Sequence, residues 1–288
     1  MRIESVIVVI NPVKGHSLRT AKTLKEALDA SHIRQEWVEA MPSHKGIYES
    51  LTDLRTKKAD LIIACGGDGT VIQTAHRSKG TGIPILGINI GYLGFITSIQ
   101  GNQVKSQLKR ILNTEFIISQ RTTLDVKVRE GRKRVTSWAV NDLVVTRGDN
   151  PHVITVKASV GKRPLTTYRC DGIIVATPTG STAYSLAAGG PIISPECNVL
   201  AITPICPHAL TSRTVIVNCS EPLEIELNGK EGSGVIQVDG MEVLRIHSDA
   251  FIEVTASPDP VPLAFLPEIN YYDVLNEKLK WTGHGITH

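Results

Sequence analysis

Apolar runs and helical periodicities alternate through the first third of the chain. Residues 5–10 (SVIVVI) and 61–65 (LIIAC) are almost wholly apolar, as expected of strands buried on both faces of a parallel sheet. Between them, residues 18–28 place leucines and an alanine at helical spacing. We therefore predict a doubly wound, Rossmann-like α/β domain with ligands at the carboxyl ends of its strands. Its other predicted elements are a weak strand at 37–38, a helix at 47–54, a strand at 83–88 and a helix at 104–112.

The pattern changes after about residue 118, where short strands replace the alternation of strands and helices. The Asn228-Gly229 and Asp239-Gly240 pairs separate some of these strands, and such pairs favour tight hairpin turns. We therefore predict an all-β, antiparallel sandwich or barrel. Its strands are expected at 124–128, 153–158, 223–227, 235–238, 243–246 and 251–254.

The two patterns define the expected domains. We predict an α/β nucleotide-binding domain at residues 1–118 and a β-rich domain at residues 119–264. Helical spacing returns between Tyr271 and Trp281, so we expect residues 265–288 to pack back on the first domain.

Composition and charge are those of an ordinary globular protein. The 288 residues carry a formal net charge of +3, which is too small to indicate a nucleic-acid partner. The five cysteines lie far apart, without a Cys-x-x-Cys pair, which argues against a disulfide framework or a zinc site. No apolar stretch reaches the length of a membrane span, and no signal-peptide core follows Met1. We therefore expect a cytoplasmic protein.

A glycine-rich loop, Gly66-Gly67-Asp68-Gly69-Thr70, joins a buried strand to a predicted helix. Glycines let the backbone approach a ligand closely, and the first amides of a helix have no partner within it. We therefore expect Gly66, Gly67, Gly69 and Thr70 to bind phosphate groups. Asp68, at the centre, is interpreted either as the helix cap or as a group that handles a proton or a metal ion.

Two further features belong to the same expected edge of the sheet. Lys14 follows the first strand and could reach a phosphate, although a solvated surface lysine has the same appearance in sequence. Glycines flank Tyr92 and Phe95 in the loop after the strand at 83–88. This loop could present an aromatic surface to an adenine, or its rings could fill the core.

Asn141 and Asp142 stand side by side at the start of a predicted strand. An asparagine can make a bidentate contact with an adenine edge, and a carboxylate can accept hydrogen bonds from ribose hydroxyls. The same pair is also common in ordinary turns.

The stretch from Arg169 to Ile193 gathers more hydroxyls and glycines than a purely structural segment needs. It predicts a short strand, a hydroxyl-rich turn and a helix that begins near Ser181 or Thr182 and ends at Gly189-Gly190-Pro191. The start of that helix would offer hydroxyls and free amides to a polar ligand. Arg169 and Asp171 stand at the other end of the strand.

Together these motifs resemble the NAD kinase family, whose members phosphorylate the 2′-hydroxyl of the adenosine ribose of NAD and so make NADP. The resemblance covers nearly the whole chain. The Gly66–Thr70 loop is shared with diacylglycerol and sphingosine kinases, whereas Asp171-Gly172 with residues 177–185 (TPTGSTAYS) is far more specific. The resemblance implies an α/β nucleotide-binding domain joined to a β-sandwich domain. It also implies a homodimer or homotetramer whose sites are completed across subunits.

The same resemblance implies roles for individual residues. Asp68 matches the catalytic base with Gly69 beside it, Asn141 would hold the adenine, and Asp142 would hold the ribose hydroxyls. It implies ATP as donor and a divalent ion, Mg²⁺, without a fixed protein site for the metal. The other positions that match the NAD pocket are His152, Arg169, Asp171, Thr182, Ala183, Tyr184, Ser185, Leu186 and Ala187.

Two residues depart from the family pattern. The commonest pair in the family is Asn-Glu, so Asp142 is one methylene shorter and must reach the ribose differently. Met241 stands where many bacterial members have glutamine, which puts that contact in doubt.

An ordinary aspartate is too weak a base to ionise a sugar hydroxyl in the ground state. The hypothesis is therefore that Asp68 orients the hydroxyl and takes its proton late in the transition state, or coordinates the metal. The residues do not distinguish ATP from another nucleoside triphosphate or polyphosphate, nor NAD from NADH.

Other functions remain open from the residues. A diacylglycerol-type lipid kinase would share the Gly66–Thr70 loop but would not need the hydroxyl-rich turn. A non-catalytic NAD-sensing module would keep Asn141 and Asp171 but would have no use for Asp68. A classical dehydrogenase is disfavoured because no Gly-x-Gly-x-x-Gly follows the first strand. Cys65 and Cys170 are interpreted as small core residues.

Overall fold

The computed structural model describes residues 3–11, 17–40, 53–91, 94–113, 115–227, 234–247 and 249–281. Lys14, Tyr92, most of the helix predicted at 47–54 and the Asn228-Gly229 turn lie outside these ranges. The described residues form two compact units, one that ends at Gln120 and resumes at Val261, and one that runs from Arg121 to Pro260. Within the described ranges, no helix is both long and apolar enough to cross a bilayer.

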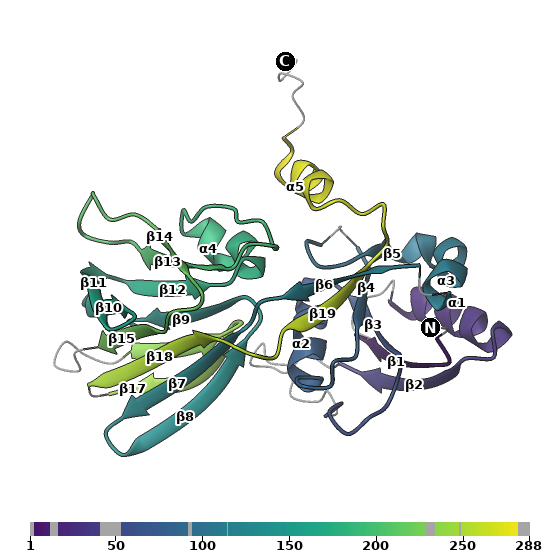
Figure 1. Ribbon diagram of the computed structural model, residues 1–288, viewed down its shortest axis with the longest axis horizontal. Helices are drawn as coiled ribbons and strands as arrows, with labels where there is room; N and C mark the ends of the chain where they lie inside the picture. Colours follow the sequence, from purple (N-terminus) through teal and green to yellow (C-terminus); the bar gives the residue numbers. More distant parts are fainter. Residues whose placement is uncertain are drawn as a thin grey trace. The chain divides into compact units, whose positions relative to one another are not determined.

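The first unit is built on a sheet with the strand order β2-β1-β3-β4-β19-β6, with β5 beside β4 (Figure 1). Strands β1, β2, β3, β4, β5 and β19 pair in parallel. The strands are β1 (Ser5–Ile10), β2 (Arg34–Glu39), β3 (Leu61–Gly66), β4 (Ile85–Asn89), β5 (Ile99–Gln100), β6 (Ile117–Arg121) and β19 (Val261–Phe265). The helices are α1 (Ser17–Ala30), α2 (Asp68–Arg77), α3 (Val104–Leu112) and α5 (Tyr271–Leu279), with a 3₁₀ turn at Gly101–Gln103.

Burial on both faces explains the apolar runs of this sheet. Every residue of β1, β3 and β4 is buried. Val8 and Ile63 face α1 and α3 in one core cluster with Leu24 and Leu108. Helix α2 packs against β3 and β4 on the other face. The predicted doubly wound arrangement is confirmed.

The second unit consists of two antiparallel sheets, ordered β11-β10-β15-β18-β7-β8 and β14-β13-β12-β9-β16-β17. Side chains from both sheets, such as Val126, Ile252, Val145 and Ile173, form one core cluster, so the predicted sandwich is confirmed. The strands are β7 (Leu124–Glu130), β8 (Lys133–Ala139), β9 (Asp142–Thr146), β10 (Ile154–Val160), β11 (Arg163–Cys170), β12 (Gly172–Ala176), β13 (Val199–Ile205), β14 (Val215–Asn218), β15 (Leu223–Leu227), β16 (Gly234–Val238), β17 (Met241–Ile246) and β18 (Ala250–Ala256).

The helix predicted to begin near Ser181 is much shorter than expected. A 3₁₀ turn at Thr179–Thr182 leads into a four-residue helix, α4 (Tyr184–Ala187). The Ser181 hydroxyl donates to the Pro178 carbonyl (2.7 Å) and accepts from the Ile193 amide (3.0 Å). The bond with Ile193 ties the segment that follows α4 back to the 3₁₀ turn.

Gly87→Ala tests the close packing at the centre of the first sheet. A Cβ at this position would lie 2.9 Å from the Thr97 Cα and 3.0 Å from Cγ2 of Val71. Because backbone would have to move, we expect the free energy of unfolding in urea to fall by about 1–3 kcal/mol. Gly69→Ala is the matched control, since nothing lies within 4 Å of a Cβ there. Equal urea midpoints for the two variants would contradict the prediction.

Candidate functional site

Asp68 is the first residue of α2, and its carboxylate holds the loop that follows β4. The N-cap of α2 is Gly67, without a side-chain capping bond, so the interpretation of Asp68 as the cap is wrong. Instead the Phe95 amide donates to Oδ2 of Asp68 (2.9 Å) and the Ile96 amide donates to Oδ1 (3.2 Å). The side chain is thereby oriented by backbone groups 27 and 28 residues away.

Two glycines make this arrangement sterically feasible. A Cβ at Gly94 would overlap Oδ1 of Asp68, and a Cβ at Gly66 would overlap the side chain of Thr70. The Gly94 amide donates to Oγ1 of Thr97 (3.1 Å), which closes the loop against the carboxylate. The glycines therefore serve close packing around Asp68 as well as approach to a ligand.

The predicted phosphate-binding residues differ in their exposure to solvent. Thr70 is 1% exposed, and its amide donates to the Gly67 carbonyl (2.9 Å), so it closes the turn. Gly66 is buried at the end of β3, whereas Gly67 is partly exposed and Gly69 is exposed. The accessible part of the loop is therefore Gly67–Gly69, with Asp68 between the two glycines.

In the second unit, the Asp239 carboxylate organises the Asn141-Asp142 pair. It accepts hydrogen bonds from the amides of Val140 (2.7 Å), Asn141 (2.7 Å) and Asp142 (3.1 Å). Asp239 and Gly240 have φ angles of 49° and 76°, as in the tight turn of a hairpin with right-handed twist. In the sequence, the Asp239-Gly240 pair predicts only the turn, and the three amides bound by the Asp239 carboxylate are 97 to 99 residues away.

Asp142 is 4% exposed, although it carries a carboxyl group. Burial raises the pKa of Asp142 to about 7, and the nearby charge of Asp239 acts in the same direction. The charge state of this side chain therefore changes near neutral pH.

The hydroxyl-rich turn packs directly on the Asn141-Asp142 pair. The Thr177 hydroxyl donates to the Val140 carbonyl (2.7 Å), and the Thr177 amide donates to the Asn141 carbonyl (2.8 Å). A Cβ at Gly180 would overlap the Asn141 backbone. The structure thus brings together two stretches that sequence analysis singled out separately.

The hydroxyls expected to face a ligand mostly bond within the protein. Ser185 is fully buried, and its hydroxyl lies 3.0 Å from that of Thr203. The Thr182 hydroxyl donates to the Thr179 carbonyl (3.2 Å). Tyr184 is 45% exposed. In the same segment, Thr182, Ala183, Leu186 and Ala187 are also at least partly exposed.

Asp171 lies where the chain crosses from one sheet of the sandwich to the other, between β11 and β12. Arg147 donates from Nε to Asp171 Oδ1 (2.9 Å) and from its amide to the Asp171 carbonyl (3.0 Å). A guanidinium nitrogen of Arg147 also bonds the Asn150 carbonyl, and the His152 amide donates to the Asn150 side chain (3.0 Å). Arg147 thus joins Asp171 to the loop of His152, and sequence analysis did not single it out.

Arg169, near the end of β11, is exposed, and its carbonyl accepts a hydrogen bond from the His208 amide (2.9 Å). It lies two residues before Asp171, at the same end of β12. Asn141 and Asp142 lie at the opposite end, because Ala176 pairs with Asp142 and Gly172 pairs with Thr146. At about 3.3 Å per residue, the five steps from Ala176 to Asp171 separate Asp142 from Asp171 by roughly 17 Å along the sheet.

Within the described part of the chain, no cluster of three or more histidine, cysteine, aspartate or glutamate side chains is placed to hold a metal ion. The described side chains therefore offer no protein-only metal site of that kind. Cys65 and Cys170 are buried, and burial raises the pKa of their thiols to about 12 and about 11. This agrees with their interpretation as core residues, since a reactive cysteine needs a lowered pKa.

Comparison with known proteins assigns both halves of the chain to one family. Residues 5–116 match the model of the ATP-NAD kinase N-terminal domain, and residues 140–265 match that of the ATP-NAD kinase C-terminal domain. An NAD kinase of Symbiobacterium thermophilum is 38% identical over 226 residues, which are 78% of this chain and 80% of that protein. One of Thermoanaerobacter sp. (strain X514) is 34% identical over 281 residues, 96% of this chain and 99% of that protein.

Solved structures agree with the fold. Yeast NADH kinase, solved in complex with NADH, superposes with a TM-score of 0.83 at 22% identity and covers 100% of this chain and 91% of its own. An NAD kinase from Archaeoglobus fulgidus, solved in complex with ATP, has a TM-score of 0.76 at 25% identity and covers 96% and 98%. Because the family models match most of the chain and relatives are similar along nearly all of it, the chain belongs to the NAD kinase family.

Proposed function

We propose that this protein transfers the γ-phosphoryl group of ATP to the 2′-hydroxyl of the adenosine ribose of NAD, with Asp68 as the catalytic base. Membership of the NAD kinase family supports the reaction. The observation that carries the role of Asp68 is its orientation by the Phe95 and Ile96 amides beside the accessible Gly67–Gly69 turn. A diacylglycerol-type kinase is disfavoured, since both halves match NAD kinase domains.

Asp68 keeps acceptor capacity after binding the loop. Each carboxylate oxygen has two acceptor sites, and each accepts one backbone amide. The remaining sites can accept the ribose hydroxyl, orient it towards the γ-phosphorus and take its proton as the new bond forms. Positioning supplies most of the catalysis in phosphoryl transfer, so a side chain held by backbone groups suits this role.

The accessible amides at the start of α2 would bind the donor phosphates. Gly67 and Gly69 carry no side chain that would block a phosphate, and the positive end of the α2 dipole favours an anion. A divalent ion bound with the donor triphosphate would neutralise phosphate charge at this loop, while the accessible Gly67–Gly69 turn would hold the phosphates.

For NAD, we infer two contact groups. Asn141 and Asp142, with the exposed residues of the Thr182–Ala187 segment, would contact the adenosine. Asp171 lies roughly 17 Å away along β12, next to Arg169 in β11 and joined to the loop of His152 through Arg147. This separation supports an assembly in which the second group completes the site of another subunit, as a homodimer or homotetramer.

The unpaired cysteines support a reducing compartment such as the cytoplasm.

Asp68→Asn should reduce kcat for NADP formation by about 100-fold or more, because general-base catalysis contributes about 10² to 10⁴. The amide side chain retains the shape but loses one basic oxygen, and with it the acceptor for one of the two loop amides. NADP formation is followed with an NADP-specific dehydrogenase, and NAD affinity is measured by calorimetry. Asp273→Asn, at an exposed position in α5, is the control for loss of one negative charge. Near-normal turnover in Asp68→Asn, with normal NAD binding, would exclude Asp68 as the base.

Asp142 should make NAD use depend on pH near neutrality. With its pKa raised to about 7, the carboxyl group is protonated below that pH and can accept both ribose hydroxyls only above it. We expect kcat/KM for NAD to rise through a midpoint near pH 7, because this parameter reports groups of the free enzyme. In Asp142→Asn the rise should disappear.

The same ionisation has an opposite effect on stability. The unfolded aspartate ionises near pH 4 and the folded one near pH 7, so the free energy of unfolding should decrease as the pH rises between these values. Asp142→Asn should lack this decrease. If the wild-type kcat/KM for NAD stayed constant from pH 6 to pH 8, the proposed role of Asp142 in NAD binding would be contradicted.

Subunit complementation tests the shared site. We expect Asp68→Asn and Asp171→Asn each to be nearly inactive alone. If each site uses Asp68 of one subunit and Asp171 of another, dimers refolded from an equal mixture should regain about a quarter of wild-type activity, because half are hybrids with one intact site. Persistent inactivity of folded hybrid dimers would place both residues in the same subunit's site.

A further inference from the structure

The segment after β19 returns to the loop that orients Asp68. The Leu266 amide donates to Oγ of Ser98 (2.9 Å) in a buried position. The Ser98 amide donates to the Gly87 carbonyl on β4 (2.8 Å). The far end of the 94–98 loop is therefore fixed between the sheet and the C-terminal segment.

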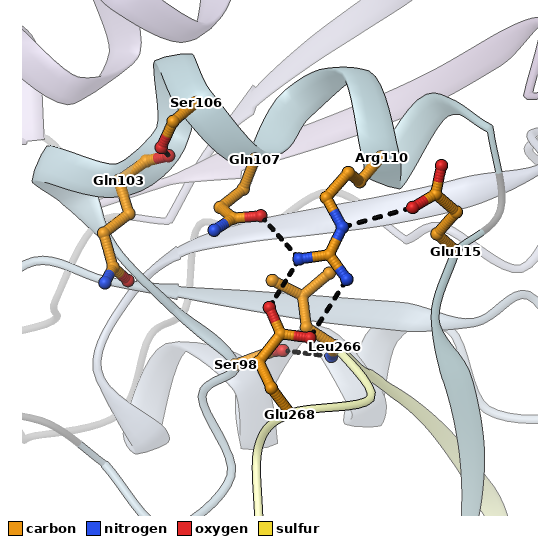
Figure 2. A network of polar contacts seen from close by, with 8 residues as sticks. All are labelled: Ser98, Gln103, Ser106, Gln107, Arg110, Glu115, Leu266 and Glu268. Carbon is orange, nitrogen blue, oxygen red and sulfur yellow. Dashed lines mark hydrogen bonds and ion pairs between the residues drawn. The ribbon is translucent and has the colours of Figure 1, made fainter.

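Two residues beyond Leu266, a fork of hydrogen bonds fixes the same segment to α3 (Figure 2). Arg110 donates from Nη1 and Nη2 to the two carboxylate oxygens of Glu268 (2.5 and 3.0 Å). Gln107 and Glu115 accept further hydrogen bonds from the same guanidinium group. Glu268 raises the pKa of Arg110, and Arg110 lowers the pKa of Glu268, so both remain charged. A bidentate pair restricts direction as well as distance, so it holds the chain just before α5 against α3.

Helix α5 places the Lys278 side chain beside Phe95, at the start of the 94–98 loop. Asn270 caps the helix through its side chain, which accepts from the Tyr272 amide (2.9 Å). In the last turn, Nζ of Lys278 lies 5.6 Å from the centroid of the Phe95 ring, within the range of a cation–π contact. Phe95 is also the residue whose amide donates to Asp68.

We propose that Lys278 is a positioning residue for phosphoryl transfer, which acts on Asp68 through the Phe95 ring and backbone. Asp68 accepts from two consecutive amides, Phe95 and Ile96. A displacement of the Phe95 ring would therefore turn both donors together and reorient the carboxylate. The effect on turnover rests on the proposed function, whereas the effect on the two amides does not.

The contact between Lys278 and Phe95 is expected to affect the position of the 94–98 loop more than the stability of the whole protein. Lys278 and Phe95 are both partly exposed, and the core of α5 is formed by Val274 and Leu275, which are buried. Removing the cation should leave the helix docked through those residues and through Glu268. The loop would then lose the restraint on the Phe95 ring while keeping the hydrogen bonds at Asp68 and Ser98.

Three variants separate positioning from structure. Lys278→Gln removes the cation, Lys278→Arg retains one over the ring, and Lys280→Gln removes a charge from an exposed position at the same helix end. Because a partly exposed cation–π contact changes an equilibrium by about two- to fivefold, we expect kcat to fall by about that factor in Lys278→Gln. KM for NAD and the melting temperature should be unchanged. Lys278→Arg and Lys280→Gln should match the wild type.

Hydrogen exchange of the Phe95 and Ile96 amides gives a readout that does not need activity. In full-length protein these amides should exchange about two- to fivefold faster in Lys278→Gln than in the wild type. The other two variants should show wild-type exchange. If the wild type makes no NADP but this pattern appears, the proposed function fails while the contact between Lys278 and the Asp68 loop stands.

A double-mutant cycle with Phe95→Leu shows whether the ring transmits the effect. In the Phe95→Leu background, Lys278→Gln should change neither kcat nor the exchange of the two amides. An effect of undiminished size without the ring would overturn the proposal. Wild-type kcat and exchange in Lys278→Gln, or equal losses in Lys280→Gln, would overturn it as well.

Discussion

The candidate active site depends on a carboxylate that accepts backbone amides from a distant loop. Asp68 begins α2 and binds Phe95 and Ile96, so the helix and the loop after β4 are held through one side chain. Gly94 must lack a Cβ for this approach. Charged acceptors form stronger hydrogen bonds than neutral ones, which explains why an irregular loop can be fixed without secondary structure of its own.

The β-sandwich unit uses the same interaction for a different purpose. The Asp239 carboxylate binds three consecutive amides at the start of β9 and thereby shapes the Asn141-Asp142 turn. Its negative charge also disfavours a second ionised carboxylate nearby, which together with burial raises the pKa of Asp142 to about 7. Asp239 therefore shapes the turn and also contributes to the raised pKa of Asp142, the residue proposed to bind ribose.

The hydroxyl-rich segment serves the fold more than its composition indicates. Thr177, Ser181 and Ser185 direct their hydroxyls to protein partners. Thr177 and Ser181 satisfy backbone groups, whereas Ser185 pairs with the Thr203 hydroxyl, since buried polar groups need partners. The surface left for a ligand consists of backbone and of side chains such as Tyr184. A cluster of hydroxyls in sequence can thus reflect hydrogen bonds within the fold as well as contacts with a ligand.

The sequence by itself determined the two fold classes, the loop that carries Asp68 and the pairing of Asn141 with Asp142. Those features depend on local patterns: apolar runs, alternation, and glycines at turns. Only the tertiary structure decided which groups those residues contact. Phe95 and Asp68, Asp239 and Asn141, and Glu268 and Arg110 are separated by 27, 98 and 158 residues. A local pattern carries no information on such contacts, because they form when strands from distant parts of the chain take their places in a sheet.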